Sequence, residues 1–396
     1  MRKRFDPRAA AALVLLAIAV CAIAAYRLHH DAGAWSPDSA IYLRMTLVDR
    51  GMSPTEAKTA SDAFMRGTPA AADPQSRDYY GPHPPAFYAS QAALFVTRPL
   101  YPAIASRLYP RFGPRALKLV SAAAFVLGAL VLFASLLPLV PAWYAALGAL
   151  AFATAPEVLD LSALALTDEL ATLFWVCTLC AMFAYVRRPA PAALVFVVLA
   201  CAALDFTRPA AYLPVGAALG ALIVVRRDAA ARRTASALVV ATLIPALAFL
   251  LYDAAVHGPS VAAQLRWQYE WERATDPAVA ASSPLAWYVR AELTAAALLA
   301  TAAIYRTAAL LPLVLGAFGA VLFRPRVLLG ILLGGTVVSL LALVVNPTEY
   351  ARTVELPVTP VVAILAAYAL AELGRVVVAT RAQRNGTNPS RATVVR

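Results

Sequence analysis

The sequence predicts an all-α polytopic membrane protein with about ten transmembrane helices. Of its 396 residues, 61% are hydrophobic and 14% are charged, whereas soluble globular chains carry about 25% charged residues. Several apolar runs are about 16 to 21 residues long, which lets a helix cross about 30 Å of hydrocarbon. Ten-residue segments of alternating polarity, typical of transmembrane barrels, are not seen. The composition therefore excludes a soluble enzyme and a disordered chain.

The predicted spans begin with the run 9–25, which follows Arg2, Lys3 and Arg4. This start also fits a signal peptide, but its apolar part is longer than the usual run of about 7 to 15 residues, so we favour an uncleaved anchor. The other predicted spans are 118–138, 141–156, 169–186, 190–205, 210–225, 234–252, 306–323, 327–345 and 354–374.

Orientation follows from the basic residues between these runs. Arginines cluster at 187–188, 226–233, 324–326 and 375–384, and with ten spans all four clusters fall on the side that holds both termini. The positive-inside rule makes that side the cytoplasm. The net charge of +12 therefore points to loop orientation and anionic lipid headgroups, and no nucleic acid partner is expected.

Two outer segments, 29–117 and 253–305, are long enough to be functional. Within them, 84–104 and 285–304 are candidate further spans, but either crossing would divide the basic clusters between the two sides. We therefore expect both to lie outside, as juxtamembrane helices. The domain prediction is one transmembrane domain over 1–374, followed by a disordered basic cytoplasmic tail over 375–396.

Charged residues gather at the outer ends of the spans. Charge is costly inside the hydrocarbon, so charges that remain near it carry information. We expect the outer helix ends to surround one pocket. The same carboxylates also fit solvated helix caps, and the arginines fit anchors at the membrane surface. The candidate residues are Asp38, Asp160, Asp168, Glu169, Asp205, Arg208, Glu349 and Arg352.

Six motifs in this order resemble those of the GT-C glycosyltransferases, in particular the bacterial enzymes related to protein O-mannosyltransferases and aminoarabinose transferases. The resemblance covers about residues 10 to 374. The motifs are PDSAIY (37–42), YYGPHPPAFY (79–88), ALKLVSAAAF (116–125), ALTDELATLFW (165–175), DFTRPAAYLPV (205–215) and YARTVELPVTPVVAILAAYAL (350–370).

This resemblance implies a GT-C-type bundle that transfers a sugar from a polyprenyl phosphate donor to a cell-envelope acceptor. The reaction would take place on the outer face of the cell inner (plasma) membrane. It implies Asp38 as the catalytic base and Asp168 as a second catalytic carboxylate. Tyr42, His83, Glu169, Arg208 and Arg352 would bind substrate. Many relatives carry Glu at the position of Ser39 and Lys at that of His83, so the need for a divalent metal ion stays open.

The chemistry of a glycosyl phosphate agrees with these roles. The reaction needs a base for the acceptor proton and cations for the departing phosphate, and attack on the far face of the sugar would invert the anomeric centre. The rival class is a transporter or lipid flippase that uses the outer carboxylates as a relay. Such a protein should carry carboxylates deep in its spans, whereas here most charges lie at span ends. An inactive scaffold of the same fold is not excluded.

Overall fold

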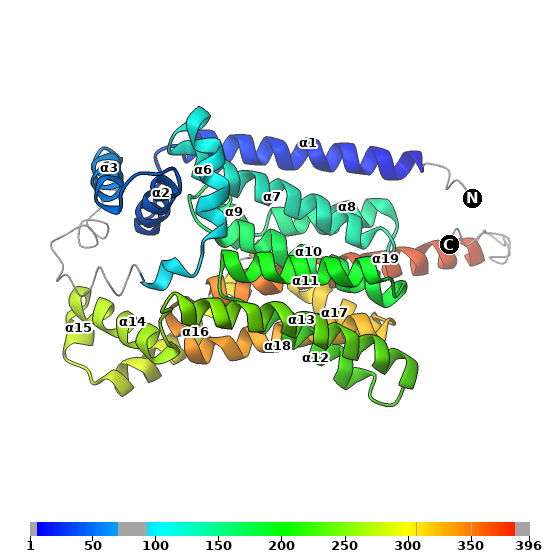
Figure 1. Cartoon of the computed structure of the whole chain (residues 1–396). Helices are drawn as coiled ribbons and strands as arrows, with labels where there is room; N and C mark the ends of the chain where they lie inside the picture. The colour runs from blue at the N-terminus through cyan, green and yellow to red at the C-terminus, as the bar shows by residue number, and fades with distance from the viewer. Residues whose placement is uncertain (1–5, 70–92, 306, 350, 385–396) are drawn as a thin grey trace.

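The computed structural model describes residues 6–69, 93–305, 307–349 and 351–384. Every secondary-structure element in this part of the chain is a helix. Most helices run side by side along one axis, and the start of α1 (Pro7–His30) and the end of α19 (Leu356–Arg384) lie at the same end of the bundle (Figure 1). We call this end the terminal end. The opposite end is the capped end, and it carries α2 (Pro37–Asp49), α3 (Pro54–Arg66), α14 (Val261–Thr275) and α15 (Pro277–Ala280).

Six helical stretches are long and apolar enough to cross a membrane: α1 (Pro7–His30), α7 (Arg115–Leu136), α10 (Asp168–Arg187), α13 (Ala229–Ala255), Arg326–Val345 and Arg352–Arg381. Arg326–Val345 consists of α18 (Arg326–Ala342) and η2 (Leu343–Val345), and Arg352–Arg381 lies in η4 (Ala351–Glu355) and α19 (Leu356–Arg384). The shorter apolar helices are α8 (Ala142–Ala153), α11 (Pro191–Thr207), α12 (Tyr212–Val224) and Leu310–Leu322 of α17 (Thr307–Leu322). The chain is an α-helical membrane protein, and each predicted apolar run coincides with one of these stretches.

Helix starts follow local capping chemistry. Asp228 precedes α13, and its carboxylate accepts hydrogen bonds from the backbone N–H groups of Ala230 and Ala231 at 3.0 and 3.1 Å. Pro191 is the first residue of α11, where its missing N–H costs no helical hydrogen bond. The sequence therefore fixes these boundaries locally, at the basic turns of the terminal end.

Helices α12 and α18 approach each other through glycine. A Cβ atom built at Gly220 would overlap the backbone oxygen of Gly330, and one built at Gly334 would overlap that of Gly216. Both helices thus carry a G-x-x-x-G pair in the contact, 216–220 in one and 330–334 in the other. Small residues let membrane helices pack backbone against backbone, where dispersion replaces the hydrophobic effect.

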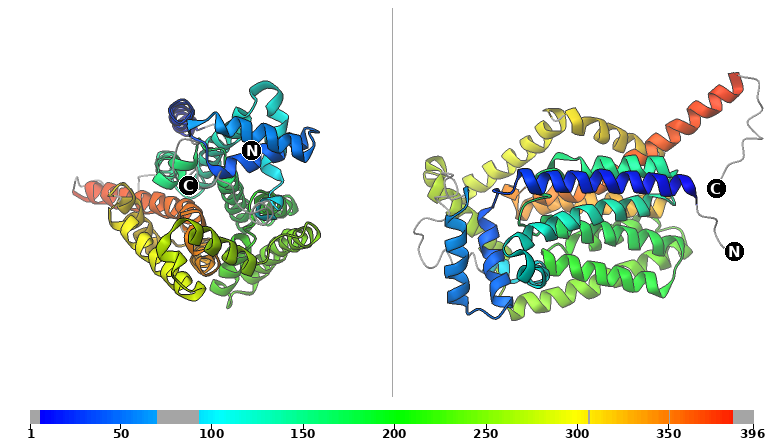
Figure 2. Two further views of the ribbon diagram at one scale, coloured as in Figure 1. Left: turned by 90° about the vertical axis from the view of Figure 1, so that its left-hand side faces the viewer. Right: turned by 90° about the horizontal axis from the view of Figure 1, so that it is seen from above.

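Three helices at the capped end lie across the bundle axis: α2 (Pro37–Asp49), α3 (Pro54–Arg66) and α6 (Leu100–Phe112) (Figures 1 and 2). Helix α2 buries Tyr42 and Leu43 at 1% exposure each in a cluster with Leu166 and Leu170, which lie at the start of α10. This packing places the first turn of α2 beside the first turn of α10. The short helix α9 (Pro156–Leu161) leads into the same region.

The structure describes parts of the two predicted outer segments and of the predicted tail. Of the candidate surface segment 84–104, residues 84–92 lie outside the described residues, and 100–104 begin α6. Segment 285–304 lies in α16 (Pro284–Tyr305), which continues toward α17 at an angle to it (Figure 2). Helix α19 extends to Arg384 rather than ending near 374, with Arg375 paired to Glu372 at 2.6 Å. Residues 385–396 of the predicted tail lie outside the described residues.

Candidate functional site

The site is built from residues at helix ends that meet at the capped end of the bundle. Asp38 lies in the first turn of α2, behind Pro37, and Asp168 is the first residue of α10. Both positions suit a carboxylate, because a helix N-terminus carries partial positive charge. Arg208 follows the last residue of α11. Arg352 lies in η4, a single π-helical turn before α19, and such turns are frequent at functional sites.

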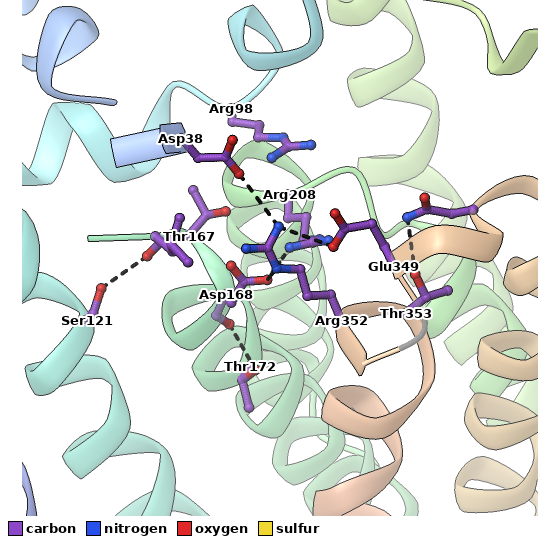
Figure 3. Close-up of polar contacts among 12 residues, drawn as sticks. Asp38, Arg98, Ser121, Thr167, Asp168, Thr172, Arg208, Glu349, Arg352 and Thr353 are labelled. Atoms are coloured by element: carbon purple, nitrogen blue, oxygen red, sulfur yellow. Dashed lines mark hydrogen bonds and ion pairs between the residues drawn. The ribbon is translucent and has the colours of Figure 1, made fainter. Parts of the chain in front are cut away.

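Arg352 connects three carboxylates. Its Nη1 lies 3.6 Å from Asp38 Oδ2 and 3.2 Å from Glu349 Oε2, and its Nε lies 3.5 Å from Asp168 Oδ1. Figure 3 shows the guanidinium between Asp38 and Asp168, with Arg208 beside it. One planar cation therefore sets the relative positions of α2, α10 and the segment that precedes α19.

Asp168 is held from two sides. Its side chain is 2% exposed, and its Oδ1 pairs with both Arg208 Nη1 and Arg352 Nε. Burying one member of such a group without its partners would cost several kcal/mol. The carboxylate therefore orients two arginines, and its burial leaves it little access to a substrate.

Asp38 differs from Asp168 in access. Its side chain is 24% exposed, and the side chain of Arg352 is 21% exposed. Partial burial raises the pKa of Asp38 above its usual value, and the nearby Arg352 guanidinium offsets part of that rise. Asp38 is thus a carboxylate that can reach a ligand and binds a proton more readily than a free aspartate does.

Tyr42 and Arg98 form the wall behind these ion pairs. The Tyr42 hydroxyl lies 3.1 Å from Thr167 Oγ1 and accepts a hydrogen bond from Arg98 Nη1 at 3.0 Å. The sequence analysis did not select Arg98 as a site residue. Arg98 lies in an aromatic, proline-rich stretch close to Phe95, and this setting could have identified it. In the structure, its guanidinium lies 4.9 Å from the centre of the Phe95 ring.

Glu169 stands apart from this cluster. Glu169 is 1% exposed, and neither of its carboxylate oxygens has a hydrogen-bond partner among the described residues. Adjacent residues of a helix point in directions about 100° apart, so Glu169 does not share the arginines that Asp168 binds. His83 lies outside the described residues.

The described part of the chain contains no group of three or more His, Cys, Asp or Glu side chains placed to hold a metal ion.

A small cavity of about 30 Å³ adjoins the cluster on the bundle side. This volume is enough for about two water molecules. Asp168, Arg208 and Arg352 line one side of it, and Trp175 and Leu356 belong to its apolar side. Trp175 is fixed there, because its Nε1 donates to the backbone oxygen of Pro357 at 2.9 Å. The arrangement puts cationic groups at the edge of an apolar interior.

The site can therefore do two things chemically. Arg208 and Arg352, 18% and 21% exposed, offer guanidinium donors to an anion such as a phosphate. Asp38 offers a carboxylate that can accept a proton beside that anion. Comparison with protein-family models, with curated proteins and with solved structures finds no match to this chain.

Proposed function

We propose that the protein is a glycosyltransferase that moves a sugar from a polyprenyl phosphate donor to a cell-envelope acceptor. The observation that carries this proposal is the partly exposed Asp38 carboxylate within 3.6 Å of the Arg352 guanidinium. A base next to a phosphate-binding cation is what transfer from a glycosyl phosphate requires. Asp168 serves as the residue that positions Arg208 and Arg352.

In the proposed reaction, an acceptor hydroxyl attacks the anomeric carbon of the donor sugar. Asp38 takes the hydroxyl proton as the new C–O bond forms. The bond between the anomeric carbon and the phosphate oxygen breaks, and its electron pair leaves with the polyprenyl phosphate. Arg208 and Arg352 stabilise the added negative charge on that phosphate. Attack opposite the leaving group inverts the anomeric centre.

We further propose that ten helical stretches cross the inner (plasma) membrane, with the terminal end in the cytoplasm and the capped end outside. Support comes from the turns between α10 and α11 and between α12 and α13, which lie at the terminal end (Figure 1). These turns carry Arg187, Arg188, Arg226 and Arg227. Basic loops are retained on the cytoplasmic side. This orientation places Asp38 on the face where a sugar carried by a polyprenyl phosphate meets cell-envelope acceptors.

The test is transfer of radiolabelled sugar in membranes that contain the protein, compared with membranes from cells that lack it. Defined polyprenyl phosphate donors with different sugars are supplied one at a time, with and without a chelator. We expect label to move from at least one donor to an envelope lipid, glycan or protein, and the chelator arm reports the metal requirement. Absence of transfer from every donor by a folded protein would refute the proposal.

One observation favours a second candidate, a transporter or lipid flippase. Glu169 and Asp205 are each 1% exposed, and Glu169 Oε1 and Oε2 and Asp205 Oδ1 lack partners among the described residues. Buried carboxylates in membrane helices often mark proton or ion paths. The discriminating measurement is translocation of a fluorescent polyprenyl phosphate across protein-containing vesicles. A flippase should show it and lose it in Glu169→Gln, whereas the proposed transferase should show none.

A further inference from the structure

A second hollow lies beside the reactive cluster, on the other side of η3 (Pro347–Glu349). It has a volume of about 270 Å³ and is bordered by α14 (Val261–Thr275), by Asp276 just before α15 (Pro277–Ala280) and by α16. Its polar lining comes from Glu272, Asp276, Trp287, Arg290, Thr294 and Thr348. Pockets for whole drug-sized ligands span about 300 to 1,000 Å³, so this hollow fits a ligand the size of one sugar ring.

Trp287 is fixed in the wall of this hollow. It is 3% exposed, its Nε1 donates to Glu272 Oε2 at 2.8 Å, and its ring lies 5.5 Å from that of Tyr269. Because the indole is held by packing and by a hydrogen bond, it forms a rigid wall, and only an edge of it can contact a ligand.

Asp276 and Arg290 supply polar groups that can turn to a ligand. Arg290 Nη2 lies 3.8 Å from Asp276 Oδ2, and the two side chains are 46% and 49% exposed. This separation is longer than a hydrogen bond. Both groups can therefore form hydrogen bonds to a hydroxyl-bearing ligand while they remain neighbours.

The hollow and the reactive cluster share one segment of chain. Pro347 and Thr348 line the hollow, and the next residue, Glu349, pairs with Arg352 at 3.2 Å. The segment is held in place from α14, because Gln268 Nε2 donates to Asn346 Oδ1 at 2.5 Å. A ligand in the hollow would therefore lie one short helical turn away from the arginine that faces Asp38.

We infer that this hollow binds a sugar ring of the acceptor, so that the acceptor is a glycan or a glycolipid. The inference rests on the proposed transferase function. Hydroxyl groups suit a lining of carboxylate, guanidinium and threonine hydroxyl groups beside an indole. Glu272 and Asp276 both line the hollow, and their carboxylates disfavour an acidic sugar and suit a neutral or amine-bearing one.

The test is direct binding of simple sugars to the full chain in lipid nanodiscs, with no donor present. The probes are the methyl pyranosides of glucose, mannose, galactose and arabinose, together with glucosamine and glucuronic acid. Tryptophan fluorescence and saturation-transfer NMR report binding. We expect at least one neutral or amino sugar to bind in the millimolar range, and glucuronic acid to bind at least about tenfold more weakly.

Two variants and one control locate the site. Asp276→Asn and Arg290→Gln should each weaken binding about tenfold or more, the usual effect of losing a charged hydrogen bond. Arg290→Gln is the second variant because Asp276 also caps α15, where it accepts from the Ala278 backbone N–H at 2.8 Å. Glu270→Gln is the matched control, because Glu270 is a half-exposed carboxylate on α14 that pairs with Arg273 outside the lining. It should bind as the wild type does.

The inference is overturned if no probe binds, or if binding is unchanged in both Asp276→Asn and Arg290→Gln. Because binding is measured without donor, it succeeds or fails independently of glycosyl transfer. Transfer without sugar binding would refute the sugar site and support the transferase function. Sugar binding without transfer would support the sugar site and refute the transferase function. Where transfer is active, Arg290→Gln should raise the acceptor KM and leave the donor KM unchanged.

Discussion

At the scale of single residues, the central contrast is between two aspartates that share one arginine. Asp38 is 24% exposed and forms an ion pair with Arg352, whereas Asp168 is 2% exposed and forms ion pairs with both Arg208 and Arg352. An accessible carboxylate suits proton transfer, and a buried carboxylate between two cations suits positioning. Removing the charge of Asp38 should therefore impair proton transfer, whereas removing the charge of Asp168 should disturb the positions of Arg208 and Arg352.

Asp38→Asn should lower the transfer rate by about 10² to 10⁴, the usual effect of removing a general base. The folded protein should persist, because the amide keeps the size of the side chain at a partly exposed position. Asp49→Asn is the matched control on the same helix, since Asp49 is exposed at the last residue of α2 and lies far along it from the cluster. The measurement is the initial rate of label transfer with saturating donor, and near-normal transfer by Asp38→Asn would refute the mechanism.

The acid side of the pH profile gives an independent test of Asp38. Only the ionised carboxylate can accept the acceptor proton, so the rate should fall as pH drops through the pKa of Asp38. Burial raises that pKa above 3.8, so the fall should occur at higher pH than it would for a free aspartate. The residual activity of Asp38→Asn should lack this acid limb. An unchanged limb in that variant would assign the titration to another group.

The sequence predicted part of this site for a clear reason. Charges are rare near the spans, so placement alone gave eight candidates. The structure brings five of them together: Asp38, Asp168, Arg208, Glu349 and Arg352. Arg98 was not selected, because its closeness to Tyr42 depends on how the chain folds between α2 and α6. Glu169 was grouped with Asp168 by adjacency, yet neighbouring helical residues face different partners.

At the scale of helices, apolar run length was a sufficient predictor of position. An uninterrupted apolar run has one stable arrangement in hydrocarbon, a helix that satisfies its own backbone hydrogen bonds. The pairing of helices was not predictable in this way, because α12 and α18 are separated by more than a hundred residues of sequence. Their glycines can be read as a contact only after the fold is known.

Gly220→Ala should destabilise the protein, although alanine usually stabilises a helix by about 0.5 to 1 kcal/mol relative to glycine. The added methyl group would overlap the Gly330 backbone oxygen, and overpacking of this kind costs about 1 to 3 kcal/mol. Gly128→Ala in α7 is the matched control, because its new Cβ would meet the Phe152 ring at an ordinary 3.7 Å.

The measurement for this pair is thermal unfolding of detergent-solubilised protein. Size-exclusion chromatography after heating to each temperature measures the fraction that stays folded. We expect a lower melting temperature for Gly220→Ala and an equal or higher one for Gly128→Ala. Equal melting temperatures for the two variants would mean that the α12 and α18 backbones are not in close contact.

At the scale of the whole molecule, the two ends of the bundle differ in construction. The terminal end has short turns, among them the arginine-bearing turns after α10 and α12, whereas the capped end carries crossing helices and the cluster around Arg352 (Figures 1 and 2). The candidate substrate contacts around Arg352 and the hollow beside η3 lie at the capped end, so their access to substrate depends on which side of the membrane that end faces.

Two cysteine variants decide this orientation. Ala60→Cys lies on the exposed side of α3 at the capped end, and Ala230→Cys lies exposed in the first turn of α13 at the terminal end. Both are introduced into a chain whose four natural cysteines, Cys21, Cys177, Cys180 and Cys201, are replaced by alanine. A membrane-impermeant maleimide added to intact cells should label Ala60→Cys and leave Ala230→Cys unlabelled until the cells are permeabilised.

The substitutions are chemically identical, so a difference in labelling reports location alone. Labelling of Ala230→Cys from outside would place Asp38 and the arginines on the cytoplasmic face, and the proposed reaction with an outer-leaflet polyprenyl phosphate could not take place there.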